Sequence, residues 1–209
     1  MAQRFVHFAA PCQCRTANEK QEHAMGFGEL GAKGIEGGRA LAASLDRRVF
    51  DDVAWTRSEQ ERLKQAVKYL SVKKGAAAAL QAHHITADPA ALTQWLSPDH
   101  APSLDVQQGV QHAFRDLRRR NIAPWLTRYL NAGRGTRIEI QPVDQEHVEA
   151  RHRRPLRVRE KNIYRWDPIV QAWASQDSLE MEHLWEWAIS ALGSDYHSYL
   201  YVERIGIFG

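Results

Sequence analysis

The stretch at residues 73–99 reads KKGAAAALQAHHITADPAALTQWLSPD, and it predicts two short helices joined by a tight turn. Small residues at 75–82 favour a closely packed first helix. Asp88 can accept hydrogen bonds from the free amides that begin a second helix, and Pro89 suits the first helical position because no donor is needed there. Residues 73–99 are therefore expected to form two short helices joined by a turn.

The second helix is expected to bury one apolar face. Leu92 and Leu96 lie four residues apart with Trp95 beside them, and Ser97-Pro98 should end the helix. Ile85 would fill the turn between the two helices. Two short helices, a tight turn and a buried apolar set together indicate a helix-turn-helix.

On these residues, the region 57–120 resembles the DNA-binding half of phage-repressor-like (Cro/CI-type) regulators. The resemblance implies that Thr86 to Gln94 enter the major groove of double-stranded DNA, where Thr93 and Gln94 are suited to base edges. The second helix has no Lys or Arg, so cations elsewhere would contact the phosphates. Two helices of an ordinary bundle remain the alternative.

Length and composition indicate a globular protein. The 209 residues suffice for one large domain or two small ones, and 44% hydrophobic with 25% charged residues is ordinary for such a chain. There is no apolar run of membrane-spanning length and no signal-peptide pattern. Two cysteines, Cys12 and Cys14, argue against a disulfide framework, so a cytoplasmic location is expected.

Charge is unevenly distributed around the net value of +3. Residues 111–161 contain 13 Lys and Arg against 6 Asp and Glu, whereas residues 162–209 contain 2 against 7. The basic segment could bind a polyanion or be neutralised by another part of the protein. The candidate phosphate contacts are Arg118, Arg119, Arg120, Arg157 and Arg159. The triplet at 118–120 also suits a helix C-terminus, which favours cations.

Apolar periodicity predicts an α+β protein with three regions. Residues 1–45 are expected to form a flexible Gly-rich arm. Residues 46–132 should form the helical domain, with Leu63, Ala66, Val67 and Leu70 on one face of its first helix and later helices at 102–120 and 123–131.

Residues 136–209 should form an α+β domain in the order β-β-α-α-β. The expected strands are 137–141, 155–160 and 196–208, with helices beginning at Asp167 and Asp177. In the second strand, Leu156 and Val158 would face the core.

The helix expected at 177–192 has an apolar arc wider than one neighbour should cover. We therefore expect a homodimer. The predicted partner-binding residues are Met181, Leu184, Trp185, Trp187 and Leu192.

Catalytic and metal motifs are weak, so no enzyme activity, metal or cofactor is predicted. No Ser or Cys stands in a nucleophile motif. The spacing of Cys12 and Cys14 with His7 and His23 matches structural zinc sites poorly, and His147 and His152 do not form a zinc-protease signature.

The leading hypothesis is a DNA-binding transcriptional regulator, possibly of phage or mobile-element origin. The alternative is a non-enzymatic protein-binding inhibitor, for example of a host or defence complex, which uses its basic strand face or its Trp-rich C-terminal helices. Salt-dependent binding to duplex DNA would separate the two.

Overall fold

The computed structural model of the chain describes residues 31–54, 58–88, 91–97, 100 and 102–208. It combines helices with a four-stranded antiparallel sheet, so the predicted α+β class is confirmed. The helices are α1 (Gly37–Ala54), α2 (Glu59–Val72), α3 (Ala76–Ala82), α4 (Leu104–Leu130), α5 (Asp167–Ser175) and α6 (Ser178–Ile189), with 3₁₀ helices η2 (Ala91–Leu96), η4 (Ala150–His152) and η5 (Ser190–Tyr199). The strands are β1 (Ile35–Glu36), β2 (Thr136–Pro142), β3 (Arg159–Ile163) and β4 (Tyr201–Phe208).

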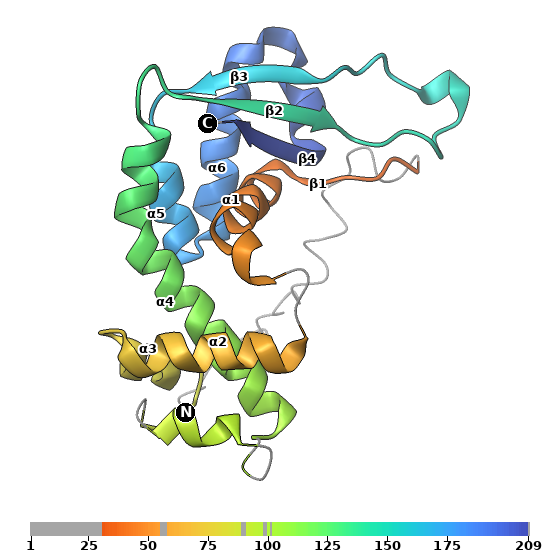
Figure 1. Ribbon diagram of the computed structural model, residues 1–209. Coiled ribbons are helices and arrows are strands. Elements are labelled where there is room, and N and C mark those ends of the chain that lie inside the picture. The colour runs from red at the N-terminus through yellow and green to blue at the C-terminus, as the bar shows by residue number, and fades with distance from the viewer. Residues whose placement is uncertain (1–30, 55–57, 89–90, 98–99, 101, 209) are drawn as a thin grey trace, which may run out of the picture.

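Helix α4 connects the two ends of the molecule. It packs against α2 and α3 at one end and against α5 at the other (Figure 1). Its 27 residues correspond to roughly 40 Å at 1.5 Å per residue. The helix continues through Pro124, where a break between two helices was predicted. Leu117, Leu126 and Leu130 are buried on both sides of the proline, so packing maintains the helix despite the missing amide donor.

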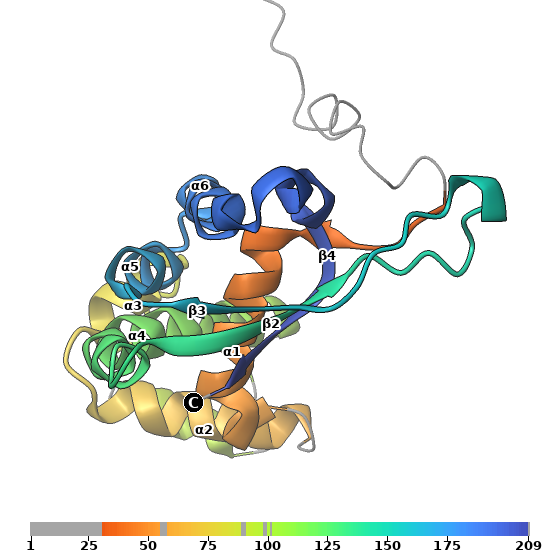
Figure 2. The same ribbon diagram turned by 90° about the horizontal axis from the view of Figure 1, so that it is seen from above.

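The sheet has the strand order β1-β4-β2-β3 and is covered on one face only. Ile138 and Ile140 of β2 are fully buried, as predicted, and they share the covered face with Ile205 of β4. Helices α1 and α6 lie on that side (Figure 2). The other face carries polar residues from the same strands, including Arg137, Glu139, Asn162 and Arg204.

The second long strand lies later in the chain than predicted and has the opposite phase. β3 begins at Arg159, and its register places Lys161 opposite Ile138, so Arg159 and Lys161 point to the covered face. Val158, expected in the core, is 45% exposed. The phase of β3 is set by Ile163, which is buried in the sheet and pairs with Thr136 of β2. Residues 144–158 instead form a loop that projects from the sheet (Figure 2).

Part of the predicted Gly-rich arm belongs to the folded body. Residues 37–45 lie in α1, which packs against β4 and α6. A Cβ atom on Gly37 would lie 1.8 Å from Trp185 Nε1, so glycine here permits close packing against α6. The four residues considered as a zinc site, Cys12, Cys14, His7 and His23, lie outside the described residues.

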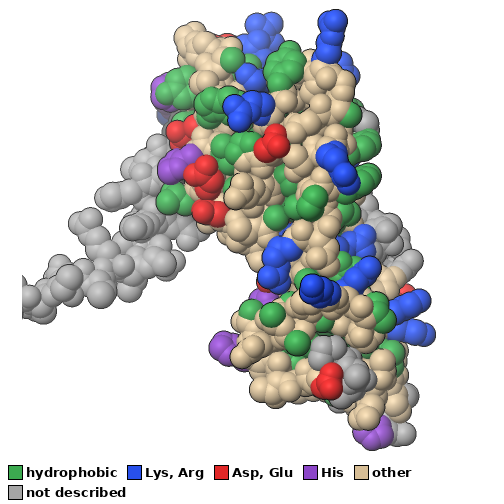
Figure 3. Space-filling view, turned by 90° about the vertical axis from the view of Figure 1, so that its left-hand side faces the viewer, with side chains coloured by type: hydrophobic (Ala, Val, Ile, Leu, Met, Phe, Trp, Pro, Cys, Tyr) green, Lys and Arg blue, Asp and Glu red, His purple; other side chains and the backbone are tan. Residues whose placement is uncertain are grey.

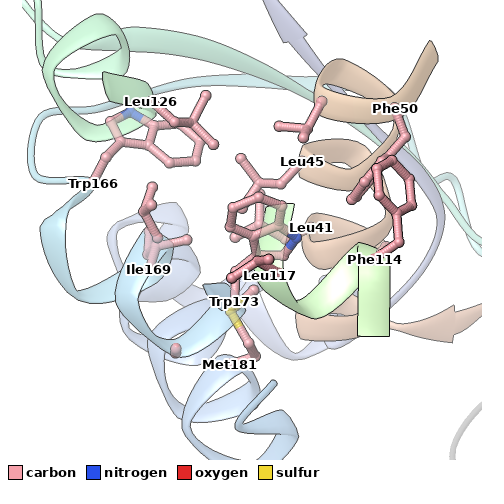
Figure 4. Close-up of a cluster of buried hydrophobic side chains, with 14 of the residues drawn as sticks. Leu41, Leu45, Phe50, Phe114, Leu117, Leu126, Trp166, Ile169, Trp173 and Met181 are labelled. Carbon is pink, nitrogen blue, oxygen red and sulfur yellow. The ribbon is translucent and has the colours of Figure 1, made fainter. Parts of the chain in front are cut away.

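One hydrophobic core joins both ends of the molecule, across the boundary predicted near residue 132. Figure 4 shows its central part, where side chains from α1, α4, α5 and α6 point toward one another. Leu41 and Leu45 meet Leu117, Trp173 and Met181 there. The predicted division into a helical and an α+β region therefore does not separate two cores.

The local sequence signals for two helices hold at residue level. In α2, Leu63, Ala66, Val67 and Leu70 are buried as predicted. The side chain of Asp177 accepts a hydrogen bond from Glu180 N at 2.9 Å and caps α6. The predicted strand at 196–208 is shorter, because residues up to Tyr199 belong to η5 and β4 begins at Tyr201.

Candidate nucleic-acid interface

The residues predicted to enter the major groove do not form a helix-turn-helix. α3 ends at Ala82, and η2, a six-residue 3₁₀ helix, begins only at Ala91. A recognition element of that kind requires a turn of three or four residues and an α-helix long enough to lie in the groove. The six residues of η2 are too few for such an element.

Side-chain exposure in this region agrees with the prediction only in part. Thr86, Thr93 and Gln94 are exposed, as a DNA-reading role requires. Leu92 is fully buried, as predicted, but Leu96 is 36% exposed where burial was expected. The three polar residues are therefore accessible without being carried by a recognition helix.

Two of the three arginines at 118–120 hold the fold together. Arg118 Nη2 donates a hydrogen bond to Val49 O at 2.8 Å, which ties α4 to α1. Arg119 makes a two-pronged pair with Asp46, at 3.0 and 2.6 Å. Arg120 is exposed, and its Nε donates to Asp116 O within the same helix. Arg118 and Arg119 thus belong to the helix packing, and their predicted phosphate contacts lose support.

The two strand arginines also differ from each other. Arg159 pairs with Asp195 and donates to the hydroxyl of Tyr199, and these neighbours raise the pKa of its guanidinium. Arg157 is exposed on the projecting loop, and its carbonyl oxygen accepts a hydrogen bond from Tyr199 at 2.8 Å. They do not form the shared basic strand face that was predicted.

Most of the predicted dimer surface is core. Met181 and Trp185 are buried, and Leu184 and Leu192 pack against the same core. The wide apolar arc of α6 is covered by α1, α5 and η5 of the same chain. Trp187 alone among the five predicted residues is prominently exposed, at 58%.

A groove between α1 and β4 brings together basic residues that are distant in the sequence. Its volume is about 660 Å³. We call it the α1–β4 groove. It is lined by Ser44, Arg47, Arg48, Glu139, Arg204, Ile205, Gly206, Ile207 and Phe208. Three arginines face one carboxylate, so the groove carries a positive charge.

The outer edge of β4 explains why two of these arginines lie here. β1 pairs with β4 only at Tyr201 and Val202, so later carbonyls need other partners. Arg47 Nη2 donates to Ile205 O at 3.0 Å, and Arg48 Nη1 lies 3.4 Å from Ile207 O. The helix thus satisfies the open strand edge and places its guanidinium groups beside the groove.

An aromatic stack extends from Arg48 along α4. Arg48 Nη2 donates to the hydroxyl of Tyr129 at 2.6 Å, and its guanidinium lies over that ring, 4.9 Å from the centroid. One turn earlier in α4, Trp125 stacks on Tyr129 at 5.2 Å with an interplanar angle of 17°. Trp125 is 51% exposed. The stack therefore ends in an indole ring that faces water.

A second aromatic ring lies at the other side of the groove. Phe208 is 46% exposed, and the guanidinium of Arg137 lies 5.5 Å from its centroid. Arg137 also pairs with the exposed Glu160 at 3.2 Å. Arg204 is exposed and forms no ion pair with any described residue. Guanidinium groups thus contact aromatic rings at two places beside the groove, at Tyr129 and at Phe208.

A different polar cluster fastens the helices at the middle of the molecule. The junction cluster consists of Asp46, His83, Asp116, Arg119, Trp173 and Gln176. Asp46 accepts from Arg119 and, at 2.9 Å, from Trp173 Nε1. Asp116 lies 2.7 Å from His83 Nε2 and accepts from Gln176 at 2.6 Å. Both carboxylates are held by donors from other elements, which indicates a packing role.

The carboxylate of Glu182 on α6 binds backbone amides at the start of α1. Glu182 accepts hydrogen bonds from Gly38 N and Arg39 N, both at 2.9 Å. Burial raises the pKa of Glu182, and the two amide hydrogen bonds oppose that effect only in part. Burial likewise lowers the pKa of Lys161 and raises that of Tyr201. These groups lie outside the α1–β4 groove.

Within the described residues, no cluster of three or more His, Cys, Asp or Glu side chains could hold a metal ion. In the same part of the chain, no helix has the length and apolar character needed to cross a membrane. Comparison with known proteins gave no match to a family model, a curated protein or a solved structure. The function is therefore inferred from the geometry of the site.

Sequence reasoning missed the groove because its two sides, 44–48 and 204–208, lie near opposite ends of the chain. Two local signals were present: the adjacent Arg47 and Arg48, and the spacing of Trp125 and Tyr129, which puts both rings on one face of a helix. Neither shows that α1 lies along the edge of β4.

Proposed function

We propose that this protein binds nucleic acid through the α1–β4 groove. The observation that carries the proposal is the pair of guanidinium–aromatic contacts beside the groove, Arg48 with Tyr129 and Arg137 with Phe208. The indole of Trp125 stacks on Tyr129. The predicted binding of DNA is thereby moved from Thr86–Gln94 to the opposite end of α4.

The arginines of the groove are suited to phosphate. Arg47 uses Nη2 to hold Ser44 and Ile205, at 2.7 and 3.0 Å, and its other N–H donors are directed to no carboxylate of a described residue. Arg204 is exposed, and its guanidinium pairs with no carboxylate of a described residue. A guanidinium presents five donors in a plane and pairs with phosphate through two parallel hydrogen bonds. The groove can therefore bind a phosphodiester backbone at two or more positions.

The surrounding surface favours a long anionic ligand. In the space-filling view of the side formed by α4 and α5, Lys and Arg side chains lie along most of the face. Asp and Glu side chains are scattered among them, several near one edge (Figure 3). Each phosphate that a protein neutralises releases condensed counterions, so affinity should fall steeply with salt. Aromatic rings between cations are typical of proteins that bind single strands.

The test is a salt titration by fluorescence anisotropy with labelled single-stranded and duplex DNA. We compare the wild type with a variant that combines Arg47→Gln and Arg204→Glu. Ser44 Oγ also donates to Ile205 O, so the strand edge keeps a partner in this variant. The matched control combines Lys64→Glu with Lys68→Gln, which makes the same change of net charge at exposed positions of α2 at the other end of the molecule.

We expect the groove variant to bind at least about tenfold more weakly and to lose about two counterions from the salt slope. The control should bind within about twofold of wild type. Equal losses in both variants would show that only net charge matters. A wild type with no salt-dependent affinity for any nucleic acid would overturn the proposal and favour the protein-binding alternative.

A further inference from the structure

The exposed indole of Trp125 requires an explanation, because half of its surface meets water on a chain that buries Trp166, Trp173 and Trp185 almost completely. Its ring partner among the described residues is Tyr129, one helical turn away. The two rings are nearly parallel. Stacking of this kind covers one face of the indole and leaves the other face available to a further planar group.

The stack is held in place from behind. Arg48 fixes the hydroxyl of Tyr129 through a 2.6 Å hydrogen bond, and Arg48 itself reaches the carbonyl of Ile207 on β4. Leu126 and Leu130, next to the two aromatic residues in the sequence, are fully buried and anchor this turn of α4. A ring held in this way loses little conformational freedom when a ligand stacks on it.

We propose that Trp125 is a stacking platform for an unpaired nucleobase, so that the nucleic acid bound by this protein is single-stranded. The inference rests on the proposed function, and it adds the class of substrate. Bases inside a duplex are already stacked and present only their edges in the grooves, whereas the bases of a single strand have open π-faces.

The charges near the stack fit the same ligand. Arg128 is exposed three residues after Trp125 and forms no ion pair with a described residue. Arg48 links the stack to the α1–β4 groove, where Arg47 and Arg204 lie. A strand whose base stacks on Trp125 would therefore have cations available on both sides for its phosphates.

The experiment measures binding of the full chain to three labelled ligands, each over the same series of salt concentrations. They are a thymidine strand of about 16 nucleotides, within the known range of single-strand site sizes, the same strand with abasic sites in its central part, and a duplex of equal length. The variants are Trp125→Ala and Trp125→Phe. The matched control is Trp187→Ala, which removes an equally exposed indole from α6.

We expect wild type to bind the thymidine strand about tenfold more tightly than the abasic strand or the duplex. Trp125→Ala should lose about tenfold on the thymidine strand and almost nothing on the abasic strand. Trp125→Phe should recover most of that loss, and Trp187→Ala should behave as wild type. A purely structural role would weaken binding to all three ligands together.

Two results would overturn the inference and can be told apart from failure of the groove. If wild type binds all three ligands equally with a steep salt dependence, the groove binds nucleic acid but Trp125 stacks no base. If Trp125→Ala reduces affinity for the abasic strand as much as for the thymidine strand, Trp125 supports the site without touching a base. If no ligand binds, both proposals fail.

Discussion

Asp46 and Arg47 are neighbours in α1, and they belong to two regions that use arginine in opposite ways. Asp46 points into the junction cluster, where Arg119 is only 12% exposed and is held by a carboxylate. Arg47 points to the α1–β4 groove, where the guanidinium groups outnumber the single carboxylate. The partners of a cation, and not the number of cations in a segment, therefore indicate where an anion can bind.

Burial accounts for the difference. A charge removed from water requires an opposite charge and hydrogen bonds, so the middle of α4 brings its arginines together with Asp46 and Asp116. At the groove, Arg47 and Arg204 are exposed to water and pair with no carboxylate of a described residue. The groove arginines, Arg47, Arg48 and Arg204, therefore lie outside the basic segment 111–161 that the charge count had indicated.

The largest expected effect comes from breaking the junction. Asp46→Ala removes the partner of both Arg119 and Trp173 Nε1. We expect a loss of about 2–3 kcal/mol in the free energy of unfolding, between the values for exposed and fully buried pairs. The midpoint temperature of thermal unfolding should fall by roughly 5–10 °C for a chain of this size.

The exposed pair of Glu59 and Arg62 on α2 provides the control, because Glu59→Ala should leave the melt almost unchanged. Nucleic-acid binding by folded Asp46→Ala protein should equal that of wild type. A variant that melts normally but binds poorly would reverse the assignment of the two regions.

A smaller effect is expected from pH at the start of α1. The pKa of Glu182 in the folded protein is raised above its ordinary value of 4.5. The folded state then binds more protons than the unfolded state as pH rises past 4.5, so the stability that this group contributes is present at low pH and is lost as pH rises through the folded pKa.

The measurement compares melts of wild type and Glu182→Gln between pH 4.5 and neutrality. The difference, wild type minus variant, should become less favourable to wild type as pH rises. A difference that grows in favour of wild type over this interval would show that the amide hydrogen bonds of Gly38 and Arg39 outweigh burial.

A still smaller change is expected inside the groove. Glu139 is its single carboxylate, and Glu139→Gln should strengthen nucleic-acid binding about twofold at low salt because one repulsion is removed. Raising the salt concentration should abolish the gain. Glu149→Gln, on the projecting loop, is the control for a change of net charge alone, and an equal gain there would place the relevant charges outside the groove.

No effect is expected at the position first predicted to read bases. Gln94→Ala changes an exposed residue of η2, far along the chain from the groove, so anisotropy titrations with single strands and duplexes should match wild type. A loss of about 1–3 kcal/mol restricted to one duplex sequence would restore the base-reading role of η2.

Much of the local structure followed from the sequence by itself. Leu63, Ala66, Val67 and Leu70 recur with the period of a helix, and Ile138 and Ile140 alternate as a strand does, so their burial could be predicted without a fold. The cap at Asp177 was equally predictable, because capping involves only residues within one turn. The α+β class follows from the change of period near Thr136.

What only the tertiary structure decided is which side chains meet and which stay in water. The phase of β3 depends on Ile163 pairing with Thr136, the helix through Pro124 depends on core contacts along α4, and the burial of Trp185 but not Trp187 depends on where α1 lies. The groove has the same origin, since Arg47 and Arg204 approach only when α1 satisfies the open edge of β4. Periodicity describes neighbours along one element, whereas contacts between distant elements are set by the packing of the whole core.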